Sequence, residues 1–290
     1  MPITETETAA AHDEVAPPEA WDAIAAGYDE FVAPGEGGIA REALRLVGLE
    51  PGESFLDVAA GPGGLSLAAA RLGATVLATD WSPAMIRHFT SRARAEGLAS
   101  TEGRVMDAHD LDLENDLFDV TGSQFGVMLV PDQPVALREM VRVTKPGGRV
   151  MLVAYGSPAE FEALQFFVAA LSSVVPDFEG LPEDPPPLEF QVSDPEVMRS
   201  RLIASGLRDV YVDTTHREEV EFGSGLDCWN WMRSSNPIVG MILSETTEEQ
   251  QATVREVLDL MIKERRGDGS SAILTAPLNI GWGWKSMPVR

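Results

Sequence analysis

Residues 54–64 read SFLDVAAGPGG, a short apolar strand that ends in a turn built on glycines. Glycine carries no Cβ, so its backbone can approach a ligand closely, and the helix predicted from Leu65 to Leu72 would present free N–H groups at the same place. A second strand, ATVLATD at residues 74–80, ends in an acidic residue 19 positions after Gly61. A carboxylate at the tip of the neighbouring strand is placed to accept hydrogen bonds from ribose hydroxyls. The two strands together predict a nucleoside site.

The chain around these two strands alternates between strand and helix. Three more strands are predicted in the first half, at Gly103–Met106, Phe118–Phe125 and Gly148–Ala154. A helix is predicted after Ser82-Pro83, because serine caps a helix and proline suits its first position, and another at Val135–Val143. This alternation is typical of parallel strands joined by crossover helices. We therefore expect an α/β fold with a doubly wound, mostly parallel seven-stranded sheet, preceded by two helices with a break at Pro34–Gly38.

The second half of the chain departs from this rhythm. Its predicted elements are a helix at Phe161–Val175, a proline-rich loop at Leu181–Leu188, a helix at Pro195–Ser205, a strand at Leu207–Phe222, helices at Asp227–Arg233 and Thr247–Arg265, and a strand at about Ile273–Lys285. The pattern contains no internal repeat and predicts no independent second core. We expect a single domain over residues 18–290, with cap elements around 157–195 and 223–270, after a disordered tail at residues 1–17.

The bulk composition limits the function classes. The chain has 290 residues, 44% of them hydrophobic, which is enough to bury a large core. Its formal charge is −24, with 46 acidic against 22 basic residues, and such a surface repels phosphate backbones and anionic lipid. No nucleic-acid partner is therefore expected. The single cysteine, Cys228, excludes an internal disulfide.

Location and metal binding are also addressed by the sequence. No apolar stretch reaches the roughly 18 residues of a membrane span, and the acidic, Thr-rich N-terminal residues lack the basic start and apolar core of a signal peptide. We expect a cytoplasmic protein without integral membrane contact, and a homodimer is left open. No set of His, Cys, Asp and Glu has metal-ligand spacing, so no metal is expected.

Two readings of the glycine loop compete. A nicotinamide or flavin site needs G-x-G-x-x-G, with the third glycine for close helix packing, and here Ser66 stands at the third place. The other reading is an adenosyl cofactor without a pyrophosphate, for which the helix N-terminus need contact only an amino acid carboxylate. Acidic residues are dense enough for the second reading, since Asp57, Asp80 and Asp107 each stand at or near the carboxyl end of a predicted strand.

Several short matches follow one another in the order and spacing of a known family. They are Leu56–Gly64, Ala78–Met85, Asp107–Ala108, Phe118–Phe125 and Leu137–Val150 with its Lys145-Pro146-Gly147-Gly148 turn, within roughly residues 20–155. In these stretches the chain resembles the class I S-adenosylmethionine-dependent methyltransferases, in the subgroup similar to the ubiquinone and menaquinone biosynthesis methyltransferases. The resemblance implies a Rossmann-like methyltransferase fold and S-adenosylmethionine as the cofactor. The terminal strands match less closely.

The resemblance implies roles on the methionine side of the cofactor for one loop, one strand tip and one helix. The residues are Asp57, Ala59, Gly61 and Gly63 in the loop, Gln124 and Phe125 at the tip of the fourth strand, and Tyr28 in the helix before the sheet. The loop would approach the methionine moiety, the strand tip would border the methionine and the methyl group, and the tyrosine would close over the methionine part. Ala59 stands where many family members have a glycine.

The resemblance also implies roles on the nucleoside side. Asp80 would bind both ribose hydroxyls, and Trp81 would pack on the adenine. Asp107 would accept a hydrogen bond from the exocyclic amine, with Ala108 beside it at the adenine edge. Met85 belongs to the same matched stretch and is expected in the cofactor site.

Methyl transfer from a sulfonium is an in-line displacement, and much of its rate can come from holding the acceptor behind the methyl group and excluding water. Such a site needs at most a base that takes the acceptor's proton. The two candidates for this base are His109, two residues past Asp107, and His216.

The acceptor is the least legible part of the sequence. The cap segments Cys228–Met232 and Phe161–Phe167 are apolar enough to line an acceptor pocket, and equally suited to ordinary packing between helices and sheet. The first reading favours an apolar or aromatic small-molecule acceptor. We therefore expect an enzyme that methylates such a molecule; a non-catalytic S-adenosylmethionine-binding protein and a nicotinamide-dependent oxidoreductase are the alternatives.

Overall fold

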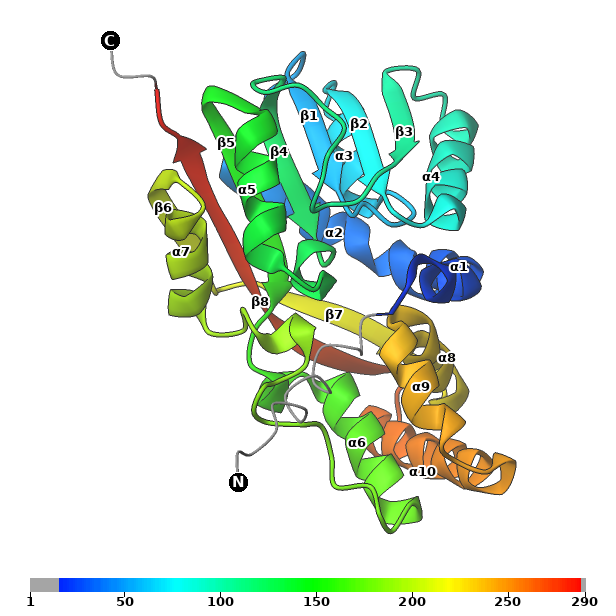
Figure 1. Ribbon diagram of the computed structural model, residues 1–290. Coiled ribbons are helices and arrows are strands. Elements are labelled where there is room, and N and C mark those ends of the chain that lie inside the picture. The colour runs from blue at the N-terminus through cyan, green and yellow to red at the C-terminus, as the bar shows by residue number, and fades with distance from the viewer. Residues whose placement is uncertain (1–15, 288–290) are drawn as a thin grey trace, which may run out of the picture.

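One mixed sheet forms the frame of the molecule in the computed structural model, which describes residues 16–287 (Figure 1). Most of the predicted tail at residues 1–17 therefore lies outside the described residues. The strands are β1 Ser54–Val58, β2 Thr75–Asp80, β3 Thr101–Val105, β4 Phe118–Gln124, β5 Thr144–Tyr155, β6 Leu207–Asp213, β7 Arg217–Phe222 and β8 Ala272–Lys285. The spatial order is β3-β2-β1-β4-β5-β8-β6, and β7 pairs with β8 beside this path. The first five strands are parallel and β8 is antiparallel, which confirms the doubly wound, mostly parallel sheet.

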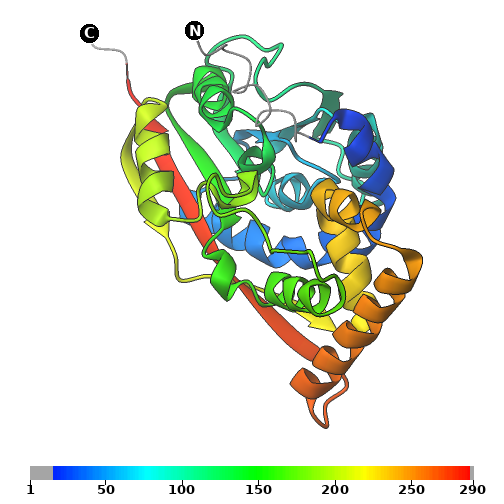
Figure 2. The same cartoon turned by 60° about the horizontal axis from the view of Figure 1, so that its bottom comes forward.

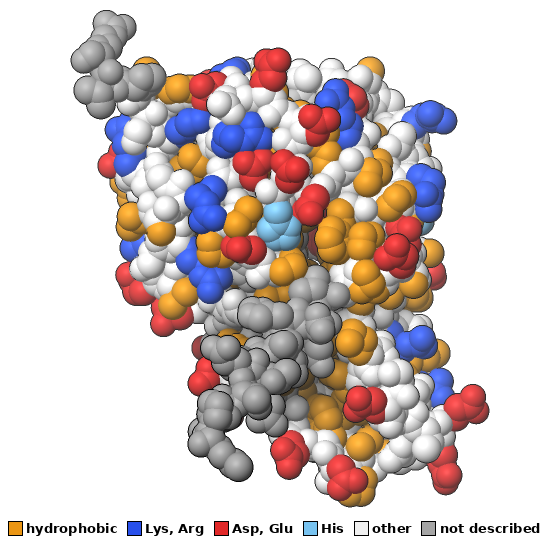
Figure 3. Space-filling model, in the orientation of Figure 1, with side chains coloured by type: hydrophobic (Ala, Val, Ile, Leu, Met, Phe, Trp, Pro, Cys, Tyr) orange, Lys and Arg blue, Asp and Glu red, His pale blue; other side chains and the backbone are white. Residues whose placement is uncertain are grey.

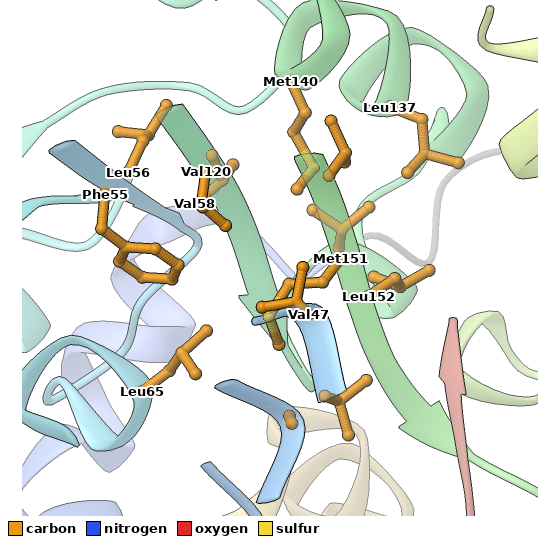
Figure 4. Close-up of a cluster of buried hydrophobic side chains, with 14 of the residues drawn as sticks. Val47, Phe55, Leu56, Val58, Leu65, Val120, Leu137, Met140, Met151 and Leu152 are labelled. Atoms are coloured by element: carbon orange, nitrogen blue, oxygen red, sulfur yellow. The ribbon is translucent and has the colours of Figure 1, made fainter. Parts of the chain in front are cut away.

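Helices cover both faces of the parallel part. They are α2 (Ala33–Val47) and α3 (Gly64–Arg71), which pack against each other, α4 (Pro83–Ala95) and α5 (Gln133–Val143). In Figure 1, α5 lies in front of β4 and β5 while α2 runs behind the sheet. Because both faces are covered, β1 and β4 are buried nearly throughout. Figure 4 shows Leu137 and Met140 of α5 and Leu65 of α3 around the side chains of these central strands.

The N-terminal helices form one unbroken but bent helical rod (Figure 2). Helix α1 (Pro18–Gly27) passes through a π-helical turn, Tyr28–Val32, directly into α2. The expected break at Pro34–Gly38 is absent, because Pro34 lies in the first turn of α2, where its missing N–H and fixed φ are tolerated. The sequence prediction of a loop here was wrong, and residues 34–38 belong to helix α2.

The predicted strand at Leu207–Phe222 is two strands. The side chain of Asp213 accepts hydrogen bonds from the backbone N–H of Thr215 (2.8 Å) and from its hydroxyl (2.7 Å), which is the geometry of a side-chain-stabilised turn. The chain turns here, so that β6 pairs with the second half of β8 and β7 with its first half. The strand prediction recognised the extended residues and missed the turn between them.

The cap contains more helices than predicted. They are α6 (Glu162–Val174), α7 (Pro195–Ala204), α8 (Gly225–Ser235), α9 (Pro237–Ser244) and α10 (Glu248–Arg266). Helix α9 was not predicted: Asn236 caps it by accepting from the N–H of Ile238 at 3.0 Å, and Pro237 begins it.

A second hydrophobic cluster lies between α6, α8, α10 and the paired ends of β7 and β8. Phe167, Trp229 and Leu258 are among its buried members, each 2% exposed or less. The cap thus has a hydrophobic cluster of its own, and the single domain over residues 18–290 stays a prediction. Strand β8 joins the two cores, because it runs from the cap into the main sheet (Figures 1 and 2).

Candidate functional site

The main pocket opens at the carboxyl ends of β1, β2 and β4, where ligands bind in open α/β sheets. Its volume is about 870 Å³, part of it open to solvent, within the range of pockets that hold cofactors and small ligands. The predicted residues that line it are Tyr28, Asp57, Ala59, Gly61, Asp80, Trp81, Met85, Asp107, Ala108, His109, Gln124 and Phe125. Gly63 and His216 are the two predicted residues that do not line it.

The glycine loop has the backbone that its sequence predicts. Ala59, Gly61 and Gly63 have positive φ angles of 54°, 55° and 91°. For Ala59 this left-handed conformation is strained, and it explains why a glycine suits the position. Gly63 caps α3 and faces the ring of Phe89, which a Cβ would overlap. Gly63 therefore serves the packing of the loop against α4.

Asp80 ties the loop to the tip of β2. Its Oδ2 accepts from the N–H of Gly61 and its Oδ1 from the N–H of Ser82, both at 2.8 Å. Burial raises the pKa of Asp80 to about 6. The carboxylate is held rigidly at the pocket wall, with acceptor capacity left on each oxygen for a pair of ligand hydroxyls.

Two buried acceptors at the pocket lack a partner among the described residues. Asp57 is 1% exposed; its Oδ2 accepts from the Ser66 hydroxyl at 2.6 Å, and its Oδ1 accepts nothing. The Oε1 of Gln124, which is 9% exposed, is equally unpaired. Burial raises the pKa of Asp57 to about 7. Unpaired buried acceptors are costly, so a ligand that donates here would be favoured, and the ammonium of a methionine moiety is such a donor.

The hydrogen bond between Ser66 and Asp57 explains why a serine stands at the position of the third glycine. Ser66 lies in the first turn of α3, directly behind β1, and its hydroxyl reaches the buried carboxylate of Asp57. A glycine there could not make this bond. The departure from G-x-G-x-x-G is thus part of the polar structure of the pocket.

His109 lines the pocket and connects the segments that contain Asp107 and Asp132. Its Nδ1 lies 2.7 Å from Oδ1 of Asp107, and its Nε2 accepts from the backbone N–H of Asp132 at 3.2 Å. Because a backbone N–H can only donate, the proton of the neutral ring is on Nδ1. Both ring nitrogens are occupied, so His109 clamps two loops together and is not a free base.

His216 lies away from the pocket. Its Nδ1 is 3.0 Å from Asp213 and its Nε2 is 3.1 Å from Glu42 on α2. These contacts connect the β6–β7 turn to the N-terminal helices. The structure thus removes His216 as a base for this site.

Sequence reasoning missed Glu36, which is 4% exposed and lines the pocket. Its Oε1 accepts from the hydroxyl of Tyr28 at 2.6 Å, and burial raises the pKa of Glu36. Two α-helical turns take about 7.2 residues, and the π-helical turn adds one, so residues eight apart face the same side of the rod. The expected break at Pro34–Gly38 hid this residue in a predicted loop.

A second tyrosine–glutamate pair lies behind the pocket. Tyr155 on β5 donates to Glu218 on β7 at 2.9 Å, and Glu218 is 2% exposed. Burial raises the pKa of Glu218 to about 7. Neither residue lines the pocket, although the Tyr155 ring stacks on Phe125 with centroids 4.6 Å apart.

The aromatic cap segments do not line the pocket. Phe161, Trp229 and Trp231 are buried in the second hydrophobic cluster instead. Burial also raises the pKa of the Cys228 thiol to about 12, which leaves it protonated and unreactive. Of the two readings of these segments, ordinary packing is the one the structure supports.

Charge and membrane features agree with the composition. Figure 3 shows acidic and basic side chains interspersed over the face it presents, without a continuous basic patch. Among residues 16–287, no helix is both long and apolar enough to cross a bilayer, and no group of three or more His, Cys, Asp and Glu is arranged to hold a metal.

Comparisons with known proteins agree with the geometry. A family model described as a methyltransferase domain matches residues 56–152. An uncharacterized protein of Mycobacterium tuberculosis is 36% identical over 144 residues, covering 50% of each chain. A demethylmenaquinone methyltransferase of Streptomyces avermitilis is 39% identical over 118 residues, covering 41% of this chain and 49% of the relative. The chain thus spans about half the length of these curated relatives.

Solved structures share the fold. The YcgJ protein of Bacillus subtilis has a TM-score of 0.56 at 17% identity, covering 87% of this chain and 99% of that one. A Haemonchus contortus phosphoethanolamine N-methyltransferase 2, solved with S-adenosyl-L-methionine, has a TM-score of 0.53 at 17% identity, covering 86% and 53%. Residues 56–152 thus match a methyltransferase domain, and the pocket at the carboxyl ends of these strands suits an adenosyl amino acid, as in the class I S-adenosylmethionine-dependent methyltransferases that the chain resembles.

Proposed function

We propose that this protein transfers the methyl group of S-adenosylmethionine to a small-molecule acceptor. The observation that carries the proposal is the set of unpaired acceptors in one pocket. Asp57 Oδ1 and Gln124 Oε1 have no hydrogen-bond donor among the described residues. At the tip of β2, the carboxylate of Asp80 is held in place and can accept hydrogen bonds from a pair of ligand hydroxyls. An adenosyl amino acid supplies both kinds of donor.

Different residues of the pocket would bind different parts of the cofactor. Asp80 would hold the ribose and Trp81 the adenine face, with Asp107 and Ala108 at the adenine edge. Asp57 and Gln124 would hold the methionine ammonium. The bound cofactor supplies an electrophilic methyl group on a sulfonium, and the protein's part is to orient the acceptor and exclude water.

The acceptor we propose is apolar or aromatic. Trp21, Leu129, Val130 and Pro131 line the pocket near the rim and give it an apolar wall. The name of the Streptomyces relative, a demethylmenaquinone methyltransferase, points to a quinone precursor as the class to test first. Because the cap aromatics are packed in their own core, the acceptor would lie against this rim rather than inside the cap.

Catalysis in this pocket would not use a histidine base. His109 lines the pocket with both ring nitrogens engaged, and it is the only histidine among the described lining residues. The acceptor would therefore need an atom that is nucleophilic at working pH, or one of the buried carboxyls would take its proton. A cytoplasmic location and a homodimer stay predictions.

Calorimetry with S-adenosylmethionine and with NAD tests the cofactor. Binding of S-adenosylmethionine in the micromolar range without binding of NAD is the expected result, and the reverse would show an oxidoreductase. Formation of S-adenosylhomocysteine with reduced naphthoquinones and simple phenols then tests turnover. Cofactor binding with no product from any acceptor of this class would favour a non-catalytic binding protein.

A further inference from the structure

The inner wall of the pocket is strongly acidic. The lining carboxyls are Glu36, Asp57, Asp80 and Asp107, and no Lys or Arg of residues 16–287 lines the pocket. Three of these four are at most 9% exposed. Buried carboxyls without a paired cation are costly, so their concentration here is unusual for a purely structural arrangement.

Glu36 and Asp57 are the two most buried of these groups, at 4% and 1% exposed. The carboxylate of Glu36 lies against Gly64, the first residue of α3, where a Cβ would overlap it. The amide of Gln124 at the tip of β4 donates to the backbone carbonyl of Glu36 at 3.4 Å. The carboxylate of Glu36 thus lies at the glycine loop, and its backbone contacts the strand tip; these are the two places where the methionine part of the cofactor is expected.

The unpaired amide oxygen of Gln124 is an independent sign of a ligand. It is not part of the carboxylate group, it is buried, and it lines the same pocket without a partner among the described residues. Together with Asp57 Oδ1 it offers acceptors beside Glu36 and no donors. An occupant with positive charge fits such a set of groups.

We infer that Glu36 is a specificity residue for the cofactor, whose carboxylate favours the sulfonium of S-adenosylmethionine over the neutral thioether of S-adenosylhomocysteine. The inference rests on the proposed function. The two ligands share the nucleoside, the ammonium and the carboxylate, and differ by one methyl group and one positive charge. At an effective dielectric constant of about 20, a carboxylate about 12 Å from that charge is worth about tenfold in relative affinity, and a closer one is worth more.

The direction of this preference has a functional consequence. Transfer of the methyl group removes the positive charge from sulfur, so the attraction to Glu36 is lost when the product forms. Glu36 therefore contributes less to the binding of the product than to that of the substrate. Glu36 would thus bias the pocket toward exchange of spent cofactor for fresh cofactor.

The molecule contains a matched control. Glu218 is also a buried carboxyl that accepts from a tyrosine, and it lies outside the pocket lining. Glu36→Gln and Glu218→Gln each remove one buried carboxylate and keep an oxygen that can accept from the tyrosine. The two variants therefore differ in whether the lost charge faces the ligand.

Calorimetry with S-adenosylmethionine and S-adenosylhomocysteine on each protein tests the inference, with circular dichroism as the check on folding. In Glu36→Gln, the ratio of the Kd for S-adenosylhomocysteine to the Kd for S-adenosylmethionine should fall about tenfold, chiefly through weaker binding of S-adenosylmethionine. In Glu218→Gln it should stay within twofold of the wild-type ratio. An unchanged ratio in Glu36→Gln, or an equal fall in both variants, would overturn the inference.

The wild-type protein gives a second readout that needs no variant. The groups that face Glu36 are Tyr28 from the π-helical turn, Asp57 from β1, Arg92 from α4 and Glu218 from β7, with Asp80 of β2 near Tyr28. Protonation of the buried carboxyls as the pH falls should lower the same Kd ratio, because the charges common to both ligands cancel. A ratio that is constant with pH contradicts the inference. Failure of the wild-type protein to bind either ligand would instead contradict the proposed function.

Discussion

The pocket and the cap core both contain aromatic side chains, but they differ in their buried polar groups and in the strain of their backbone. In the cap, Trp229 and Phe167 are fully packed, with ring centroids 6.3 Å apart. At the pocket, Ala59 and Phe125 keep positive φ angles of 54° and 58°. Of the three unpaired buried side-chain acceptors in the described chain, two line the pocket. Strain and unpaired acceptors, rather than aromatic density, distinguish the site from the core.

The largest expected effect is a loss of stability in the cap core with no change in cofactor binding at the pocket. Trp229→Ala removes a side chain that is 2% exposed from the second cluster, and it should lower the free energy of unfolding by about 3–5 kcal/mol. S-Adenosylmethionine affinity of the folded protein should stay within about twofold, since Trp229 does not line the pocket. Urea denaturation and calorimetry measure the two quantities.

Trp81→Ala is the matched control for this variant. Trp81 is half-buried and lines the pocket, so its loss should weaken cofactor binding more than it weakens the fold. If both tryptophan variants changed stability and affinity in the same proportion, the distinction between pocket and cap core would be wrong.

A smaller effect is expected at the tip of β2. Asp80→Ala removes the acceptors for Gly61, for Ser82 and for the proposed ribose hydroxyls, and should weaken S-adenosylmethionine binding by about 2–3 kcal/mol. S-Adenosylhomocysteine should lose the same amount, because the ribose is common to both ligands. Wild-type affinity for both in calorimetry would refute the ribose role. Unequal losses would mean that Asp80 acts on the sulfonium.

The buried carboxyl of Glu218 predicts a pH dependence of stability. Burial raises the pKa of Glu218 from its ordinary value of 4.5 to about 7, so the folded state holds the proton more tightly. The stabilisation is complete below the unfolded pKa and is lost as pH rises through the folded value. Between pH 5.5 and pH 8 this one group should lower the free energy of unfolding by about 2 kcal/mol.

Urea denaturation of wild type and Glu218→Gln at the two pH values checks this expectation. The variant should show a shallower pH dependence, because the group that titrates is gone. Asp57 and Asp80, whose pKa values burial also raises, keep part of the slope in both proteins. A variant that retains the full wild-type slope would show that Glu218 is not the titrating group.

The smallest expected effect concerns the loop. Ala59→Gly relieves a left-handed alanine and should raise the free energy of unfolding by about 1 kcal/mol. Ala60→Gly, at a neighbour without positive φ, should lower it by up to about 1 kcal/mol, because glycine adds freedom to the unfolded chain. Thermal denaturation of both variants measures the contrast. The two changes in the free energy of unfolding should have opposite signs, and destabilisation in both variants would argue against strain at Ala59.

The nucleoside half of the site could be predicted from the sequence because its parts are local. The glycine turn, Asp80 and Asp107 each follow directly on a strand, and parallel strands bring their carboxyl ends to one edge. The methyltransferase family model matches residues 56–152, which contain all three of these motifs. Local motifs and a regular topology sufficed here.

The rest depended on features with no local signature. Glu36 reaches the pocket only because a π-helical turn keeps the rod continuous and in phase with Tyr28. His109 and His216 resembled candidate bases until their partners, contributed by distant segments, were known. The aromatic cap residues read equally well as a pocket wall or a core, and only the position of β7 and β8 decides between them.

The length of β8 affects how the protein unfolds. Its 14 residues pair with β7 at one end and with β5 and β6 at the other, so neither core can lose this strand alone. We expect calorimetric unfolding in one cooperative transition rather than a separate melting of the cap. A chain that ended before residue 272 would leave the edge of β5 unpaired, and such an exposed strand is prone to aggregation.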